Sequence, residues 1–133
     1  MTETLHRGGC LCGAIRFRAT GEPIRTSLCY CTQCRRQTGS AMPAFATFPA
    51  TAVGLEQGAA AGFSASPRAV RQFCAACGST LFWREHDTGE VDVFLGAFDA
   101  PERLPPPARQ IWTKHRLHWV AAVAAIPAFA EQP

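Results

Sequence analysis

Apolar and polar side chains alternate along several short stretches of the chain, which is the pattern of half-buried strands. Within residues 14–19, Ile15 and Phe17 alternate with Arg16 and Arg18, so one side of this segment faces a core. Further strands are expected at residues 42–48, 70–73, 80–84 and 91–95. The pattern therefore predicts a mainly β protein built from short strands.

Two of these strands flank a turn-forming segment, His-Asp-Thr-Gly at residues 86–89, which predicts a β-hairpin. Val91 and Val93 alternate with Glu90 and Asp92 in the second strand of this hairpin. Because successive side chains of a strand point to opposite faces, we expect the two acids to face solvent.

Helical signals are few. Residues 32–37 are expected to form a short helix that ends at Gly39. Asp99 is an N-cap candidate with Pro101 at the first helical position, and the prolines at 105–107 would end such a helix quickly. The other local expectations are a short helical turn at residues 121–125 and a loop at residues 59–62.

The composition is that of a globular protein. The chain has 133 residues, of which 47% are hydrophobic, and we expect one domain over residues 1–133 with a core at about 8–120. A chain of this length buries roughly two-thirds of its unfolded surface and folds without cross-links. Its seven cysteines therefore need another explanation, and their odd number excludes complete pairing within one chain.

The ends of the chain bear on location and partners. Residues 1–9 lack the apolar run of a secretory signal, which predicts a reducing cytoplasm, where cysteine clusters are usually metal ligands or catalytic groups. Residues 119–130 are apolar but shorter than the ~20 residues of a membrane span. A charge of +3 without a basic, aromatic cluster predicts no nucleic-acid partner. The apolar residues 121–129 make a homodimer plausible.

The cysteines fall into three groups: Cys10-x-Cys12, Cys29-x-Cys31-x2-Cys34 and Cys74-x2-Cys77. Residues i and i+2 of an extended segment point the same way, so a C-x-C pair can offer two thiolates to one ion. A C-x2-C pair turns tightly, and Gly78 removes a side chain where the backbone folds back. Zinc in structural sites takes four ligands, and thiolate is a common one.

Spacing leaves two partitions of the cysteines open. In a zinc ribbon, Cys31 and Cys34 would join Cys74 and Cys77 on one ion. In the other partition, one ion has the ligands Cys10, Cys12, Cys74 and Cys77, and a second has Cys29, Cys31 and Cys34. The three-thiolate site would then keep an open fourth position, as catalytic zinc sites do.

Four segments together resemble the glutathione-dependent formaldehyde-activating enzyme family, whose domain also occurs in centromere protein V. They are GGCLCGAIRF (8–17), CYCTQCRRxxG (29–39), FCxxCGSxL (73–81) and VDV (91–93). The resemblance implies a β-tent fold, in which small antiparallel sheets are clasped by zinc. It also implies the second partition, with a structural zinc on Cys10, Cys12, Cys74 and Cys77 and an active-site zinc on Cys29, Cys31 and Cys34.

The activity that this resemblance implies is carbon–sulfur lyase chemistry on the adduct of glutathione and formaldehyde, or on a related small thiol adduct. Zinc would hold the incoming thiol as thiolate or polarise the aldehyde oxygen. The four histidines are candidate proton carriers. One departure stands out: the family often has His before an Ile-Trp pair, and here Arg109-Gln110 precedes Ile111-Trp112.

Arg35 and Arg36 directly follow the third cysteine of the candidate active site. They either bind the carboxylates of a peptide thiol such as glutathione, or balance thiolate charge and face solvent. The alternative function is a non-enzymatic zinc-binding, redox or interaction module of the same fold. Seven thiolates and two zinc ions would together cancel the formal charge of +3.

Overall fold

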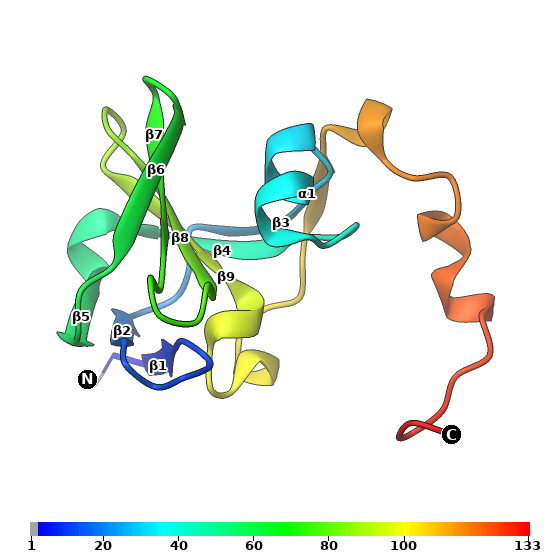
Figure 1. Ribbon diagram of the computed structural model, residues 1–133, viewed down its shortest axis with the longest axis horizontal. Helices are drawn as coiled ribbons and strands as arrows, with labels where there is room; N and C mark the ends of the chain where they lie inside the picture. The colour runs from blue at the N-terminus through cyan, green and yellow to red at the C-terminus, as the bar shows by residue number, and fades with distance from the viewer. Residues whose placement is uncertain (1–2) are drawn as a thin grey trace.

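The computed structural model describes residues 3–133, which form two β-sheets (Figure 1). The three-stranded sheet has the order β1 (Leu5–Gly9), β2 (Arg16–Thr20), β5 (Val53–Gln57). The seven-stranded sheet has the order β10 (Arg109–Ile111), β3 (Arg25–Cys29), β4 (Ala44–Pro49), β9 (Glu90–Phe94), β8 (Thr80–Glu85), β7 (Ala69–Phe73), β6 (Ala61–Ser66). β10 runs parallel to β3, and the other strand pairs within residues 3–133 are antiparallel.

The helices are short. α1 (Thr32–Thr38) follows β3, and it ends at Gly39, whose φ of 74° is the left-handed conformation that favours glycine. The 3₁₀ helices are η1 (Ala50–Ala52), η2 (Leu95–Ala97), η3 (Pro101–Arg103), η4 (Thr113–His115) and η5 (Val120–Ala125). The expectation of a mainly β fold with few short helices is confirmed.

The main core lies between the two sheets. Phe17 of β2 packs edge-to-face against Phe82 of β8 and against Phe98, with ring centroids 5.2 and 5.3 Å apart. Val91 and Val93 of β9 are fully buried in the same cluster. Edge-to-face aromatic pairs add about 0.5–1.5 kcal/mol to the burial of their apolar surface. This core leaves the opposite face of the seven-stranded sheet free to carry polar side chains.

A row of directly opposed residues crosses that second face. Arg25 of β3 is opposite Thr47 of β4, which is opposite Asp92 of β9. Asp92 is opposite Trp83 of β8, and Trp83 is opposite Arg71 of β7. Opposed residues in adjacent strands share a face, so all five side chains lie on the same side of the sheet.

The hairpin prediction is confirmed, but one detail of it is wrong. β8 and β9 pair across the turn at residues 86–89, and the two valines of β9 face the core as expected. Glu90 and Asp92 do not face open solvent. They line a pocket on the second face of the sheet, where both are half-buried.

The predicted strands correspond to β2, β4, β7, β8 and β9, with ends that differ by one or two residues. β1, β3, β5, β6 and β10 were missed because they are polar, rich in glycine or only three residues long. Residues 59–62 are only partly a loop, since β6 begins at Ala61. Asp99 does not cap η3: the N-cap is Ala100, and Asp99 pairs with Arg16 instead.

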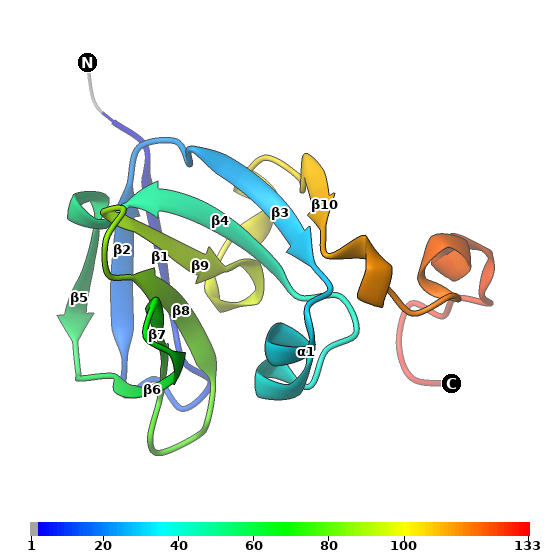
Figure 2. The same cartoon turned by 90° about the horizontal axis from the view of Figure 1, so that it is seen from above.

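The C-terminal segment, from Trp112 onward, extends away from the two sheets in both views (Figures 1 and 2). It contains η4 and η5 and exposes several large apolar side chains. Among the described residues, every helix is too short or too polar to span a membrane.

Candidate functional site

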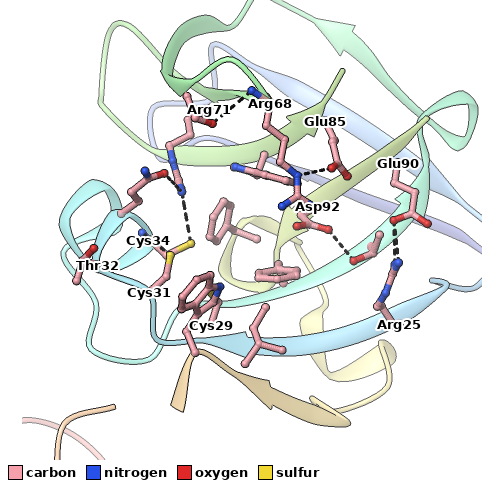
Figure 3. Close-up of a pocket in the computed structure, with 18 of the residues that line it drawn as sticks. Arg25, Cys29, Cys31, Thr32, Cys34, Arg68, Arg71, Glu85, Glu90 and Asp92 are labelled. Atoms are coloured by element: carbon pink, nitrogen blue, oxygen red, sulfur yellow. Dashed lines mark hydrogen bonds and ion pairs between the residues drawn. The ribbon is translucent and has the colours of Figure 1, made fainter. Parts of the chain in front are cut away.

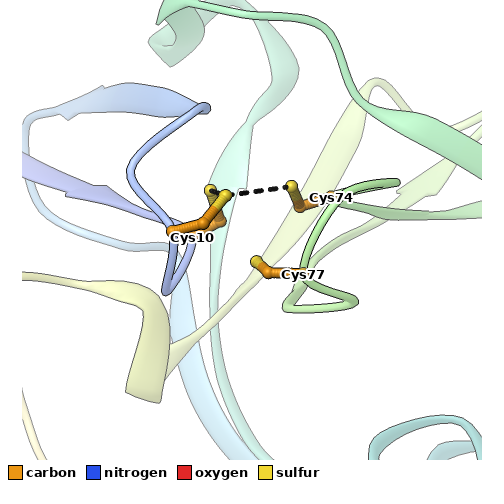
Figure 4. A group of neighbouring side chains, drawn as sticks. Cys10, Cys74 and Cys77 are labelled. Atoms are coloured by element: carbon orange, nitrogen blue, oxygen red, sulfur yellow. Dashed lines mark hydrogen bonds between the residues drawn. The ribbon is translucent and has the colours of Figure 1, made fainter.

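Four cysteines meet where two loops approach each other (Figure 4). Cys10 and Cys12 lie in the loop between β1 and β2, and Cys74 and Cys77 in the loop between β7 and β8. Their sulfur atoms all lie within 4.8 Å of one another, with Sγ–Sγ distances of 3.6 Å from Cys10 to Cys12 and 3.8 Å from Cys12 to Cys74. This is the grouping that the second partition predicts.

Local backbone geometry shapes both loops. Gly13 and Gly78 follow the second cysteine of each pair and adopt positive φ values of 81° and 79°, which a side chain would strain. The two loops are joined because the backbone N–H of Leu11 donates to Oγ of Ser79 over 2.9 Å. Hydrogen bonding with Ser79 also lowers the pKa of Cys77 to about 5, which favours the thiolate that a metal requires.

The other three cysteines converge around the start of α1. Cys29 ends β3, Cys31 is the N-cap of α1, and Cys34 lies in its first turn. The sulfur of Cys31 accepts a hydrogen bond from the backbone N–H of Cys34 over 3.2 Å. Cys29 and Cys34 are only 4% and 6% exposed. Hydrogen bonding between Cys29 and Cys34 lowers the pKa of Cys34 to about 6 and raises the pKa of Cys29.

Both clusters suit a thiophilic divalent ion such as zinc. All seven cysteines are free thiols. Cys31 and Cys34 lie in a different cluster from Cys74 and Cys77, whereas a zinc ribbon would bring these four together. Four thiolates can complete a tetrahedral zinc site, whereas three leave one position for another ligand.

The three-cysteine cluster forms one wall of a pocket of about 420 Å³ on the second face of the seven-stranded sheet (Figure 3). This size is within the range of small-molecule sites. Phe45 and Phe94 pack against the cysteines and make this end of the pocket apolar. The side chains of the row from Arg25 to Arg71 form its floor, so a thiol group and charged groups of one ligand could be bound together.

Arg71 is buried against the three-cysteine cluster. The residue is only 4% exposed, and its Nη1 and Nη2 atoms lie 3.6 and 3.7 Å from Sγ of Cys34. Nη2 is also 3.4 Å from Oε1 of Gln33. An arginine stays charged in a protein, and a buried charge needs a partner of opposite sign. The thiolate of Cys34 supplies that charge.

The other arginines of the pocket differ in how they are paired. Arg25 donates two hydrogen bonds to one carboxylate oxygen of Glu90, and Arg68 pairs with Glu85. Arg109 of β10 donates to the hydroxyl of Ser27 over 2.8 Å and has no carboxylate partner within residues 3–133. It is therefore the pocket arginine best able to receive an acidic group of a ligand.

Asp92 lies in the middle of the pocket floor. Its Oδ1 accepts a hydrogen bond of 2.6 Å from the hydroxyl of Thr47, and within residues 3–133 its Oδ2 has no hydrogen-bond partner. Burial raises the pKa of Asp92 to about 6, although Thr47 and the positive charge of Arg25 oppose this rise. A carboxyl group that titrates near neutral pH in a cleft is typical of functional sites.

Other predicted site residues lie elsewhere. Arg35 and Arg36 are not among the described residues that line the pocket. Both lie on α1, where Arg35 is half-buried and Arg36 is exposed. Among the histidines, His115 lines the pocket and stacks on Trp112, with ring centroids 6.2 Å apart. His6 is buried in the core.

Gln110 occupies the place where the resembled family often has histidine. Its Oε1 accepts hydrogen bonds from the hydroxyl of Tyr30 over 2.7 Å and from Arg116 over 3.0 Å. Both bonds use the one oxygen, so Gln110 ties the start of the C-terminal segment to the end of β3. In this chain, the side-chain oxygen at position 110 is thus occupied by Tyr30 and Arg116 of the protein itself.

The sequence alone assigned no role in the site to Arg71, Asp92 or Arg109. Arg71 lies three residues before Cys74 on a strand, and this spacing carries no known metal-binding signal. Asp92 was noted for its alternation with valine and as part of the VDV segment at residues 91–93, and neither observation shows that the face it occupies is concave. Only the pairing of strands brings these residues to the cysteines of α1.

This mainly β fold, with free thiols gathered into clusters of four and three, defines a cysteine-rich protein whose two clusters could hold metal ions. Residues 5–115 match the family described as Glutathione-dependent formaldehyde-activating enzyme, and the chain belongs to this family.

Two curated relatives are similar over much of the chain. An uncharacterised lyase of Schizosaccharomyces pombe is 32% identical over 93 residues, which are 70% of this chain and 66% of that protein. A Halomonas elongata protein, provisionally named a glutathione-dependent formaldehyde-activating enzyme, is 28% identical over 87% of this chain and 80% of its own length. The chain thus spans about two-thirds of the first relative and four-fifths of the second.

The fold also matches a solved structure. A crystal structure of a Rhodobacter sphaeroides protein superposes with a TM-score of 0.62 at 22% identity. The match covers 78% of this chain and 98% of that one. At this level of identity, the likeness establishes a common fold.

Proposed function

We propose that this protein is a zinc-dependent carbon–sulfur lyase resembling S-(hydroxymethyl)glutathione synthase, which acts on the adduct of glutathione and formaldehyde or on a related small thiol adduct. The observation that carries the proposal is the three-cysteine cluster in the wall of a pocket that also presents charged side chains. The family and the names of the relatives agree with it.

Each cysteine cluster has a proposed role. Cys10, Cys12, Cys74 and Cys77 hold a structural zinc, because four thiols close the coordination sphere. Cys29, Cys31 and Cys34 hold the active-site zinc and are the catalytic ligands. When bound, this zinc supplies the means to keep a substrate thiol deprotonated. Arg71 offsets the negative charge that three thiolates leave on a divalent ion.

The pocket suits a thiol that also carries acidic groups. Arg109 lacks a carboxylate partner among the described residues and is proposed to bind one carboxylate of glutathione. The roles predicted for Arg35 and Arg36 remain a proposal for a second contact, made from outside the pocket lining. Glu85 and Glu90 supply negative charge for an ammonium group of the same ligand.

We also infer that residues 1–133 form one domain, which functions in a reducing cytoplasm without a nucleic-acid or membrane partner. Seven free thiols support the reducing location, because such clusters oxidise readily outside it. A homodimer formed through residues 121–129 remains part of this proposal.

The experiment that tests the function is two-dimensional exchange NMR on glutathione and labelled formaldehyde, with and without the zinc-loaded protein. We expect the protein to accelerate exchange between free thiol and adduct in proportion to its concentration. The Cys31→Ser variant, which loses one ligand of the pocket cluster, should not accelerate it. If the wild-type protein gives no acceleration, the proposed activity on glutathione fails, in favour of another small thiol adduct or of a non-enzymatic zinc-binding or redox module.

A further inference from the structure

We propose that Asp92 is the proton carrier of this site: it takes the proton from the substrate thiol and returns it to the aldehyde oxygen. This inference rests on the proposed function, because it assigns a role within the same pocket. It differs from the sequence expectation, in which the four histidines are the candidate proton carriers.

The first argument is position. Asp92 is two residues from Phe94 on β9, and strand alternation places both side chains on the pocket face. Phe94 belongs to one buried cluster with Cys29 and Cys34, and Trp83, the residue directly opposite Asp92 on β8, packs against that cluster. In Figure 3 the side chains of Asp92 and Cys34 both point into the pocket. Asp92 and the cysteines therefore line the same pocket, and a ligand bound at the cysteines can extend toward the carboxyl group.

The second argument is the carboxyl group itself. Thr47 holds Oδ1 through a bond of 2.6 Å, which fixes the orientation of the side chain. Within residues 3–133, Oδ2 has no hydrogen-bond partner. It is not one of the fully buried polar atoms, so it remains accessible from the pocket. Oδ2 is thus free to exchange a proton with a ligand in the pocket. General acid–base catalysis requires a group oriented in this way.

The third argument is the surrounding charge. Among the described residues, the charged or titratable groups that line the pocket with Asp92 are Arg25, Cys29, Cys31, Cys34, Arg68, Arg71, Glu85, Glu90, Arg109 and His115. Arg25, Arg68 and Arg71 are each paired with another group, so none of them forms an ion pair with Asp92. A carboxylate locked in an ion pair would be a poor proton acceptor.

The step balances without an outside reagent. Ionised Asp92 accepts the thiol proton at Oδ2, and the electron pair left on sulfur forms the carbon–sulfur bond to the aldehyde carbon. The electron pair of the carbon–oxygen π bond moves to oxygen, which takes the proton back from Asp92. Cleavage of the adduct is the same sequence in reverse, so the carboxylate is regenerated in both directions.

His115 is the histidine of the described residues that lines the pocket, and it is the next candidate for the proton carrier because Glu85 and Glu90 are held in ion pairs with Arg68 and Arg25. It belongs to the C-terminal segment and is exposed, and its ring stacks on Trp112. No hydrogen bond of the described residues orients its ring nitrogens toward the cysteines. Asp92 is more deeply placed and better fixed, so we assign the role to Asp92.

The test compares Asp92→Asn with two other variants in the zinc-loaded protein. Asp92→Asn keeps the shape of the side chain and an acceptor for Thr47, and Asp87→Asn removes a carboxylate from the exposed turn between β8 and β9 as the matched control. We expect Asp92→Asn to slow the protein-dependent exchange about 100-fold and to abolish its rise with pH between 5 and 7. Asp87→Asn should leave both unchanged, and His115→Gln should keep the pH profile.

A second measurement does not depend on turnover. In wild-type protein labelled at its aspartate carboxyl carbons, the Asp92 signal should shift when glutathione binds in the absence of aldehyde. Metal content and circular dichroism show whether each variant is folded. If the Asp92→Asn variant does not fold, the response of the wild-type Asp92 carbon signal to glutathione tests the proposal by itself.

The outcomes separate the two proposals. An active wild type with an equally active Asp92→Asn variant, or an Asp92 signal that ignores glutathione, overturns the role of Asp92 alone. If the rise with pH is lost in His115→Gln and kept in Asp92→Asn, the role of Asp92 is also overturned, and His115 is the proton carrier. A wild-type protein that does not accelerate exchange at all overturns the proposed function, and the role of Asp92 with it.

Discussion

The guanidinium group of Arg71 lies directly against the sulfur of Cys34, with two nitrogen–sulfur distances of 3.6 and 3.7 Å. One residue comes from β7 and the other from α1, 37 positions apart in the sequence. Three thiolates on a divalent ion would leave one net negative charge, which the buried arginine is placed to neutralise. A metal site in a buried wall depends on such outer contacts as well as on its ligands.

Replacing Arg71 by Met should therefore weaken metal binding at the three-cysteine cluster by about 10- to 100-fold. The four-cysteine cluster of the same protein is the internal control, because Arg71 does not contact it. Titration with cobalt(II), followed by its thiolate absorption bands, measures the two affinities. Arg71→Lys should restore part of the loss. An unchanged affinity at the pocket cluster would mean that the arginine does not stabilise the thiolates.

Loss of a ligand should have different effects at the two clusters. Cys77→Ser should prevent stable folding, since structural zinc contributes about 10–16 kcal/mol in small zinc-binding peptides. Cys31→Ser should keep the fold and lose only one metal ion. Thermal denaturation followed by circular dichroism, together with metal analysis, checks both, and the wild type should contain between one and two zinc ions per chain. A Cys77→Ser variant as stable as wild type would contradict the structural role.

Much of the fold could be predicted from local pattern, because β2, β4, β7, β8 and β9 alternate strictly or carry aromatic residues. The short helix at α1 and its end at Gly39 follow from the same kind of local signal. β6 was missed for a physical reason: it is an edge strand with an exposed face, so its sequence carries no burial pattern.

The candidate site was predictable only in part. Cysteine spacing marks the candidate metal ligands because the cysteines within each of the three sequence groups lie close together in the chain. Asp92 and Arg71 come into the pocket through strand pairing, and Arg109 through the parallel pairing of β10 with β3 across 82 positions. Such long-range register has no local signal in one sequence.

Arg109 should distinguish thiols by their acidic groups. Arg109→Gln is expected to weaken glutathione binding about tenfold or more, because a charge-assisted hydrogen bond is worth about 1.5–3 kcal/mol. Binding of 2-mercaptoethanol, which has no carboxylate, should change little. Isothermal calorimetry on both thiols gives the comparison. Arg35→Gln and Arg36→Gln, measured in the same way, test the prediction made from sequence, and a larger effect there would move the carboxylate contact to α1.

His6 should make the protein less stable in acid. Burial lowers the pKa of His6, and its Nε2 is buried without a hydrogen-bond partner. Unfolded chains take up this proton near pH 6.5, whereas the folded protein resists it. Stability contributed by neutral His6 is therefore present above pH 6.5 and is lost as the pH falls through the lower folded pKa.

Urea denaturation of wild type and His6→Leu between pH 5 and 8 measures this contribution. The difference in unfolding free energy should change in favour of the leucine variant as the pH falls, while acid-induced metal loss affects both proteins alike. A difference that is constant with pH would show that His6 does not resist protonation.

The C-terminal segment should mediate self-association. Trp119, Val123, Ile126 and Phe129 expose between 41% and 66% of their surface, which is a large apolar area for a free segment. Light scattering after size exclusion should give a dimer for residues 1–133 and a monomer for a chain that ends at Leu117. A monomeric full-length chain would contradict the predicted homodimer.

Cys12 and Cys74 are 62 positions apart in sequence, yet their sulfur atoms are 3.8 Å apart. An ion held by this cluster would tie the loop after β1 to the loop after β7, one from each sheet, and so act as a removable cross-link. By analogy with a disulfide, closing a loop of that length removes roughly 4 kcal/mol of chain entropy from the unfolded state.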